Sequence, residues 1–200
     1  MSKKDKELST EIDMSKLSRV SNGAEAKTST VMPYVTFSGK TGEWTYGFEQ
    51  DPLSHTREIL VGGKTFTLGF IGWENGAVVG EVMVSVFSDE PMPELKDLEP
   101  KLANEGMNGW SEQKAVNFVI DGKAHVFKGT AYGAKDMINQ LSAAVLAQHA
   151  VHPQACNPII TVGEDHYTHK KFGSVIYSPT FKIVGWAGDD GVPAAKALAA

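Results

Sequence analysis

Apolar and polar residues alternate along much of the chain after residue 30, as expected of strands that bury one face. Segments 31–38 and 43–48 flank the turn sequence SGKTG and predict a first hairpin. Segments 57–61 and 64–73 flank a Gly-Gly pair, and Asn75-Gly76, which suits the positive φ angles of a type I′ turn, precedes segment 77–87. These last three segments predict a three-stranded meander.

The pattern changes twice in the second half of the chain. Residues 88–109 are polar and interrupted by prolines, which predicts a long loop with a helical turn near residues 94–98. A hairpin is then expected from segments 114–120 and 124–129 around the turn DGK. From residue 134 to 151 the apolar spacing becomes three and four, which predicts one amphipathic helix that ends before Pro153. Segments 158–163 and 174–186 follow as a final pair of strands.

This order of elements predicts an α+β fold that is mostly antiparallel β, a small OB-like barrel with one amphipathic helix before the last hairpin. A sandwich or jelly-roll fragment would have a similar order. We expect a single β-rich domain at residues 31–187, a flexible N-terminal arm at residues 1–30 and a flexible C-terminal tail at residues 188–200, because both ends lack apolar periodicity.

Composition restricts the partners and the compartment. The formal net charge is −5, so a nucleic acid would have to be held by a local basic patch. Cys156 is the only cysteine, and the chain shows neither a signal-peptide pattern nor an apolar run near the roughly 20 residues of a transmembrane helix. We therefore expect a cytoplasmic protein with no membrane association.

Motifs for catalysis or nucleotide binding are weak. SGKT at residues 38–41 and GGKT at residues 62–65 lack the first glycine of a P-loop and lie between strands, so tight turns are the simpler interpretation. Thr130 is a candidate N-cap residue for the helix. No G-x-S-x-G or H-E-x-x-H pattern is present, and we expect no enzymatic activity and no cofactor.

Five residues raise the question of a metal, which the sequence leaves open. His149 and His152 stand three apart, Cys156 follows, and His166 and His169 repeat that step. Zinc accepts such ligands. However, a histidine near a helix C-terminus also interacts with the helix dipole without a metal.

Aromatic and cationic residues gather in the last third of the chain, where residues 120–186 hold six lysines and four acidic residues. Exposed rings that stack on bases and lysines that contact phosphates are typical of single-stranded nucleic-acid binding. The candidate binding residues are Lys123, Lys128, Tyr167, His169, Lys170, Lys171 and Phe172, with Trp44, Tyr46 and Trp73 as secondary stacking candidates. Lysines at a hairpin tip also protect a sheet edge from pairing, and for Lys170 and Lys171 the two interpretations weigh equally.

Three motifs carry a resemblance: GEWTYG at residues 42–47, IGWENGAVVGEVMV at residues 71–84 and HYTHKKFGSVIYSPTFKIVGW at residues 166–186. With them the chain resembles a family of tailed-bacteriophage proteins encoded beside replication and recombination genes. The resemblance implies a setting in phage DNA metabolism in the host cell cytoplasm, and it fits a single-stranded DNA-binding protein with an OB-like barrel. One departure is the tail, which has only Asp189 and Asp190 where many such proteins end in a strongly acidic segment.

The sequence thus predicts a non-catalytic protein that binds single-stranded DNA in phage DNA replication or recombination, with replication or recombination proteins as further partners. The alternative is a phage structural (virion) protein or a module that binds a host factor. A zinc-dependent enzyme is a third option. The preference for DNA over RNA and the oligomeric state, a homodimer among the options, stay open.

Overall fold

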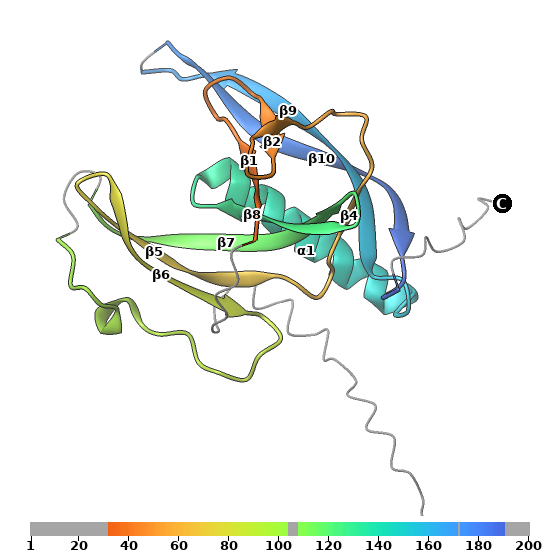
Figure 1. Cartoon of the computed structure of the whole chain (residues 1–200), viewed down its shortest axis with the longest axis horizontal. Coiled ribbons are helices and arrows are strands. Elements are labelled where there is room, and N and C mark those ends of the chain that lie inside the picture. Colours follow the sequence, from red (N-terminus) through yellow and green to blue (C-terminus); the bar gives the residue numbers. More distant parts are fainter. Residues whose placement is uncertain (1–31, 104–107, 172, 191–200) are drawn as a thin grey trace, which may run out of the picture.

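The structure is a computed structural model that describes residues 32–103, 108–171 and 173–190 (Figure 1). The predicted N-terminal arm and most of the predicted C-terminal tail lie outside these residues. The described part contains ten strands in one sheet, one α-helix and one short 3-10 helix. These elements are β1 (Tyr34–Phe37), β2 (Trp44–Tyr46), β3 (Asp51–Pro52), β4 (Ile59–Val61), β5 (Thr67–Glu74), β6 (Ala77–Ser85), η2 (Leu95–Asp97), β7 (Gly109–Ile120), β8 (Lys123–Gly129), α1 (Tyr132–Val151), β9 (Asn157–Thr168) and β10 (Val175–Ala187).

The sheet is organised around β7, which pairs with β8 along one edge and with β5 and then β4 along the other. The order along the sheet is β10-β9-β4-β7-β8-β1-β2-β3, while β6 pairs only with β5 in the described residues. Neighbouring strands are antiparallel except for β1 and β8, which are parallel. The fold is therefore mostly β, with one helix and a curled, open sheet of mixed strands.

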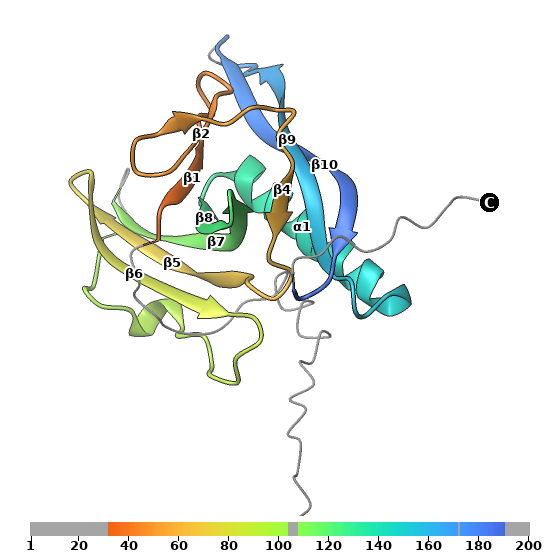
Figure 2. The same cartoon turned by 45° about the vertical axis from the view of Figure 1, so that its right-hand side comes forward.

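Helix α1 lies inside the curl of this sheet, between β7–β8 and β9–β10, as Figures 1 and 2 both show. Its apolar stripe buries Met137, Ile138, Leu141 and Val145, which join the same core as the buried side chains of the sheet. A spacing of three and four places these four side chains on one face of the helix. The predicted helix is confirmed; its N-cap is Ala131, next to Thr130, and no side chain caps it.

The turn between β1 and β2 closes the open side of the curl against β9 and β10. The Trp44 indole donates a hydrogen bond to the Gly163 carbonyl in β9 at 2.9 Å, and the Tyr177 amide of β10 donates to the Gly39 carbonyl at 2.9 Å. Trp44 is only 2% exposed and packs against Phe37 and Phe127. Two ends of the sheet that are distant in strand order are thus joined.

Gly42 in this turn is expected to tolerate a side chain poorly. Its φ is +78°, and a Cβ added there would lie 2.7 Å from the Tyr177 ring. Gly76 offers a matched control, because its φ is +80° and nothing lies within 4 Å of its added Cβ. We expect Gly42→Ala to lower the free energy of unfolding by about 1 kcal/mol or more beyond Gly76→Ala, since only Gly42 adds a steric clash to the backbone strain. Urea unfolding of both variants measures this difference, and equal losses would refute the role of the Tyr177 contact.

The structure confirms four of the predicted strand pairings and corrects one, within the meander. The Asn75-Gly76 turn joins β5 to β6, Asp121-Gly122 joins β7 to β8, and the first and last pairs form as expected. However, β4 does not pair with β5, because the chain does not reverse at Gly62. The Gly62 amide donates to the Asn117 carbonyl of β7 at 2.9 Å, so β4 and β5 run along β7 in succession with the turn as a bulge between them.

A buried lysine joins α1 to β7 and makes stability depend on pH. Lys114 is 5% exposed, and its ammonium donates to the Asn139 side chain at 2.9 Å. Burial lowers the pKa of the Lys114 ammonium below its usual 10.5, so the unfolded chain holds this proton more strongly than the folded protein. The free energy of unfolding should therefore gain a contribution from this residue as the pH rises toward 10.5.

Lys114→Met is the matched variant for this prediction, because it keeps an apolar side chain of similar length and removes the charge. The difference in free energy of unfolding, wild type minus variant, should become more positive from pH 7 to pH 11 in chemical denaturation. A difference that stays constant across this range would contradict the proposed cost of burying the charged lysine.

Candidate nucleic-acid interface

The outer parts of β9 and β10 form a two-stranded ribbon that projects beyond the rest of the sheet (Figure 1). Strand β4 pairs with β9 only at Ile159 and Ile160, whereas β9 and β10 pair with each other as far as Thr168 and Val175. Trp44 contacts the ribbon near its base. The β1–β2 turn contacts the ribbon at Tyr177, so the face of the ribbon opposite Tyr177 is the one open to a ligand near the tip.

The turn at the ribbon tip is fixed by backbone hydrogen bonds. The His169 amide donates to the Ser174 carbonyl, and the Gly173 amide donates to the His169 carbonyl, both at 2.8 Å. Gly173 has a φ of +67°, a conformation that glycine adopts without strain. The Lys171 amide also donates to Nδ1 of His169 at 3.3 Å. The tip thus holds Lys170 and Lys171 next to the end of β9.

The two faces of the ribbon differ in character. Val162 and Phe181 pair across the ribbon on the face that packs against the core. The alternating positions place Tyr167 and its partner Ile176 on the opposite face, which we call the outer face. Tyr167 is 54% exposed there, so its ring is available for stacking.

Two cations at the ends of this outer face are free of protein partners in the described part of the chain. Lys170 at the tip and Lys182 near the base are exposed, and neither makes a hydrogen bond or an ion pair with a described residue. Lys182 lies on the same face as Ile176, the outer face, because it stands six residues further along β10 and every second residue of a strand shares a face. Lys171 is also exposed, and the Glu164 carboxylate near the base lies 3.3 Å from Nδ1 of His55.

Two predicted lysines lie elsewhere. Lys128 is on β8, where its ammonium contacts both carboxylate oxygens of Glu81 at 2.7 Å and lies 5.5 Å from the centre of the Tyr34 ring. This pairing balances the charge of Lys128 within the protein, and its predicted contact with a phosphate stays a prediction. Lys123 is exposed at the opposite end of β8, beside the turn from β7. Neither lysine belongs to the ribbon.

The secondary stacking candidates are not on the ribbon either. Trp44 is a core residue, and this burial overturns its predicted stacking role. Tyr46 is half-buried, accepts a hydrogen bond from Arg57 at 2.9 Å and packs edge-on against His125. Trp73 is half-buried at the β5–β6 turn. Phe172 lies outside the described residues.

Of the predicted binding residues, the structure therefore brings together Tyr167, His169, Lys170 and Lys171. Sequence reasoning left Lys182 out of the set. The alternation along β10 was a usable signal, because it places Lys182 on the face of Ser178 and Thr180. The missing information was the register of the last hairpin, which pairs Tyr167 with Ile176 across a six-residue turn.

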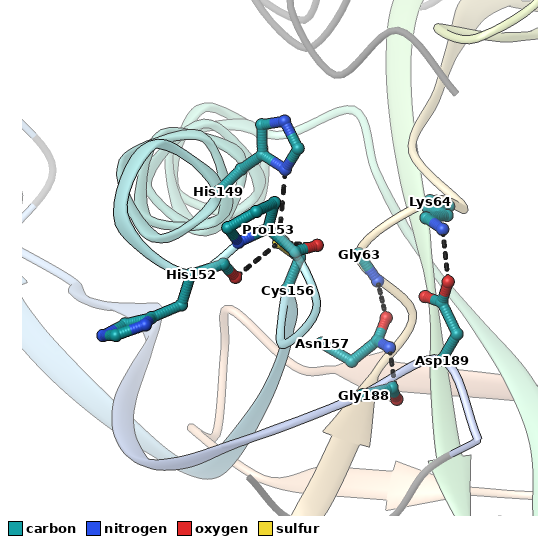
Figure 3. A network of polar contacts seen from close by, with 9 residues as sticks. All are labelled: Gly63, Lys64, His149, His152, Pro153, Cys156, Asn157, Gly188 and Asp189. Atoms are coloured by element: carbon teal, nitrogen blue, oxygen red, sulfur yellow. Dashed lines mark hydrogen bonds and ion pairs between the residues drawn. The ribbon is translucent and has the colours of Figure 1, made fainter. Parts of the chain in front are cut away.

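The candidate metal ligands are split between two ends of the molecule. His149 and Cys156 lie together near the end of α1, with Sγ 3.6 Å from Nδ1, as Figure 3 shows. His166 is on the ribbon, where its ring packs against Tyr177, and His169 is in the tip. In residues 32–103, 108–171 and 173–190 no group of three His, Cys, Asp or Glu side chains could hold a metal ion.

The surroundings of Cys156 are structural. Its thiol contacts the carbonyls of His152 and Pro153 at 3.5 and 3.4 Å, and burial raises the pKa of the thiol. The adjacent Asn157 accepts from the Gly63 amide and donates to the Gly188 carbonyl, both at 2.8 Å (Figure 3). A protonated, buried thiol is a poor nucleophile, and the contacts of Cys156 and Asn157 fix the base of β9.

No protein-family model matches the chain, and neither curated proteins nor solved structures give a match. None of the helices in the described residues combines the length and the apolar character that crossing a membrane requires.

Proposed function

We propose that the protein binds single-stranded DNA in phage replication or recombination through the outer face of the β9–β10 ribbon. The observation that carries this proposal is the exposed Tyr167 ring on a face with Lys170 at one end and Lys182 at the other, both without partners in the described residues. A base can stack on the ring while the two ammonium groups contact phosphates of the same strand. Seven residues separate Val175 from Lys182, roughly 24 Å at about 3.4 Å per residue, so the face is long enough for several nucleotides.

The strand connections support an OB-type barrel within this proposal. An OB-fold is a five-stranded barrel in which the first strand pairs with the second and the fourth and a helix precedes the fourth. The strand interrupted at Gly62, formed by β4 and β5, pairs with β7 and β9, and α1 lies between β8 and β9. The β1–β2 hairpin, however, stands where an OB-fold pairs its third and fifth strands.

In this correspondence the ribbon tip is equivalent to the loop between the fourth and fifth strands of an OB-fold. That loop is one of the two that bind oligonucleotides in OB-folds. The site inferred from the exposed Tyr167 ring and from Lys170 and Lys182 is therefore the same site that the OB-like strand connections favour. A net charge of −5 makes such a local interface necessary, because the molecule as a whole repels a polyanion.

A fluorescence anisotropy titration of a labelled oligothymidine tests the proposal. We expect binding that weakens as salt rises, because phosphate contacts release counterions. Tyr167→Ala should lower the affinity roughly 5- to 150-fold, the equivalent of one lost base stack of about 1–3 kcal/mol, without lowering stability. Tyr34→Ala, which removes an exposed ring from the β1–β8 side, is the matched control and should bind normally. Absence of binding at low salt would refute the proposal.

A structural or host-factor-binding role is the competing proposal, and the end of the β5–β6 hairpin favours it. Val78 and Val79 are exposed on β6, which pairs only with β5 in the described residues. An exposed apolar strand edge can pair with another chain. Analytical ultracentrifugation distinguishes the two proposals if Val78→Lys abolishes self-association or partner binding and leaves oligonucleotide binding intact.

A further inference from the structure

A pocket of about 260 Å³ lies between the first turns of α1 and the middle of β10. Its polar lining comes from both elements and from β9: Tyr132, Asp136, Gln140, Asp165, Ser178 and Thr180. Met137 and Phe181 add apolar surface. Tyr132 is 82% exposed, which leaves its ring open to solvent beside the pocket.

Two carboxylates, Asp136 and Asp165, line this pocket and act only as hydrogen-bond acceptors when ionised. Asp136 uses one carboxylate oxygen to accept from Gln140 at 2.8 Å, and Asp165 uses one to accept from the His166 amide at 2.7 Å. The second oxygen of each carboxylate has no hydrogen-bond partner among the described residues. Two carboxylates would repel a phosphate, so the occupant that fits is a group with N–H donors.

The pocket is continuous with the outer face of the ribbon. Asp165 and Ser178 pair directly across β9 and β10, and each lies two residues from the Tyr167–Ile176 pair. A period of two residues places both pairs on the same face of the ribbon. A strand with one base stacked on Tyr167 therefore has the pocket next to it in the direction of Lys182.

We propose that this pocket takes one base of the bound strand and prefers guanine. The inference rests on the proposed binding of single-stranded DNA. Guanine carries adjacent donors, the ring N1–H and the exocyclic amino group, which match the two oxygens of a carboxylate or two neighbouring carboxylates. Thymine has a single ring N–H between two carbonyl oxygens, and those oxygens would face the carboxylates unfavourably. The pocket therefore adds base selectivity to an interface whose stacking and phosphate contacts carry none.

The experiment compares three oligothymidines that differ at one central position: thymine, guanine or hypoxanthine, which is guanine without the exocyclic amino group. A single guanine per strand avoids guanine quadruplexes. In anisotropy titrations at one salt concentration, the guanine strand should bind roughly 5- to 150-fold more tightly than the thymine strand, with hypoxanthine between them. Asp165→Asn and Asp136→Asn should each reduce this guanine-to-thymine ratio. Asp97→Asn, an exposed carboxylate in η2, should keep it.

The outcomes distinguish a failure of this inference from a failure of the proposed function on which it rests. Binding of all three strands with equal affinity overturns the guanine preference and leaves the proposed function standing. A preference that survives both pocket substitutions overturns the assignment to this pocket. If no strand binds, the proposed function fails and the inference fails with it.

Discussion

Exchanging Lys170 and Lys171 for glutamate is expected to weaken the binding of single-stranded oligonucleotides by roughly tenfold or more at about 0.1 M salt. Both ammonium groups are exposed at the ribbon tip, where the outer face meets the turn. Each lost phosphate contact should also reduce the slope of log K against log salt by about 0.7, so the double variant should lose about 1.4 in slope. Anisotropy titrations at several salt concentrations measure both quantities.

A matched control separates a local contact from the effect of total charge. Lys96→Glu with Lys101→Glu changes the net charge by the same amount in the polar loop between β6 and β7, where each lysine is paired with a neighbouring glutamate. We expect this control to retain most of the affinity. If both double variants lose affinity equally, Lys170 and Lys171 affect binding only through the total charge of the protein. Their role at the ribbon tip would then be protection of the strand edge.

Trp44→Ala is expected to give the largest loss of stability, about 3–5 kcal/mol in the free energy of unfolding. The indole is buried among Phe37 and Phe127 and also donates the hydrogen bond to Gly163 that joins β2 to β9. Trp44→Phe should cost less, since it keeps a ring in the core and loses mainly the hydrogen bond. Urea unfolding followed by circular dichroism measures both variants.

The binding readout of the same variants checks the corrected role of Trp44. Trp44→Phe should bind oligonucleotide like the wild type, because the ring is not on the interface. A Trp44→Ala protein with nearly unchanged stability and greatly reduced binding would restore the stacking role and contradict the core assignment.

The elements were predictable from the sequence because local patterns determine them. Asn75-Gly76 and Asp121-Gly122 adopt the positive φ angles that a two-residue turn requires, and the spacing of Met137, Ile138 and Leu141 is that of a helix face. The strand partners were not predictable in the same way. The parallel pairing of β1 with β8 and the continuation of β4 into β5 along β7 depend on contacts between distant segments, which no local period records.

The same distinction between local patterns and contacts of distant segments applies to the candidate site. Tyr167, Lys170 and Lys171 are neighbours in sequence, so one stretch of residues was enough to group them. Trp44 was assigned incorrectly, and the pairing of Lys128 with Glu81 was not foreseen, because the partners are remote: Glu81 is 47 positions from Lys128, and Gly163 is 119 positions from Trp44. Alternation in a strand identifies two faces but does not say which one the fold buries.

Photo-crosslinking tests the central claim, that the outer face of the ribbon carries the nucleic acid, most directly. An oligonucleotide with a photoreactive thymine analogue at each position in turn is irradiated with the protein, and the adducts are located by mass spectrometry. We predict adducts on Tyr167 that disappear in Tyr167→Ala. Adducts confined to Tyr34 on β1, with none on the ribbon, would contradict the account.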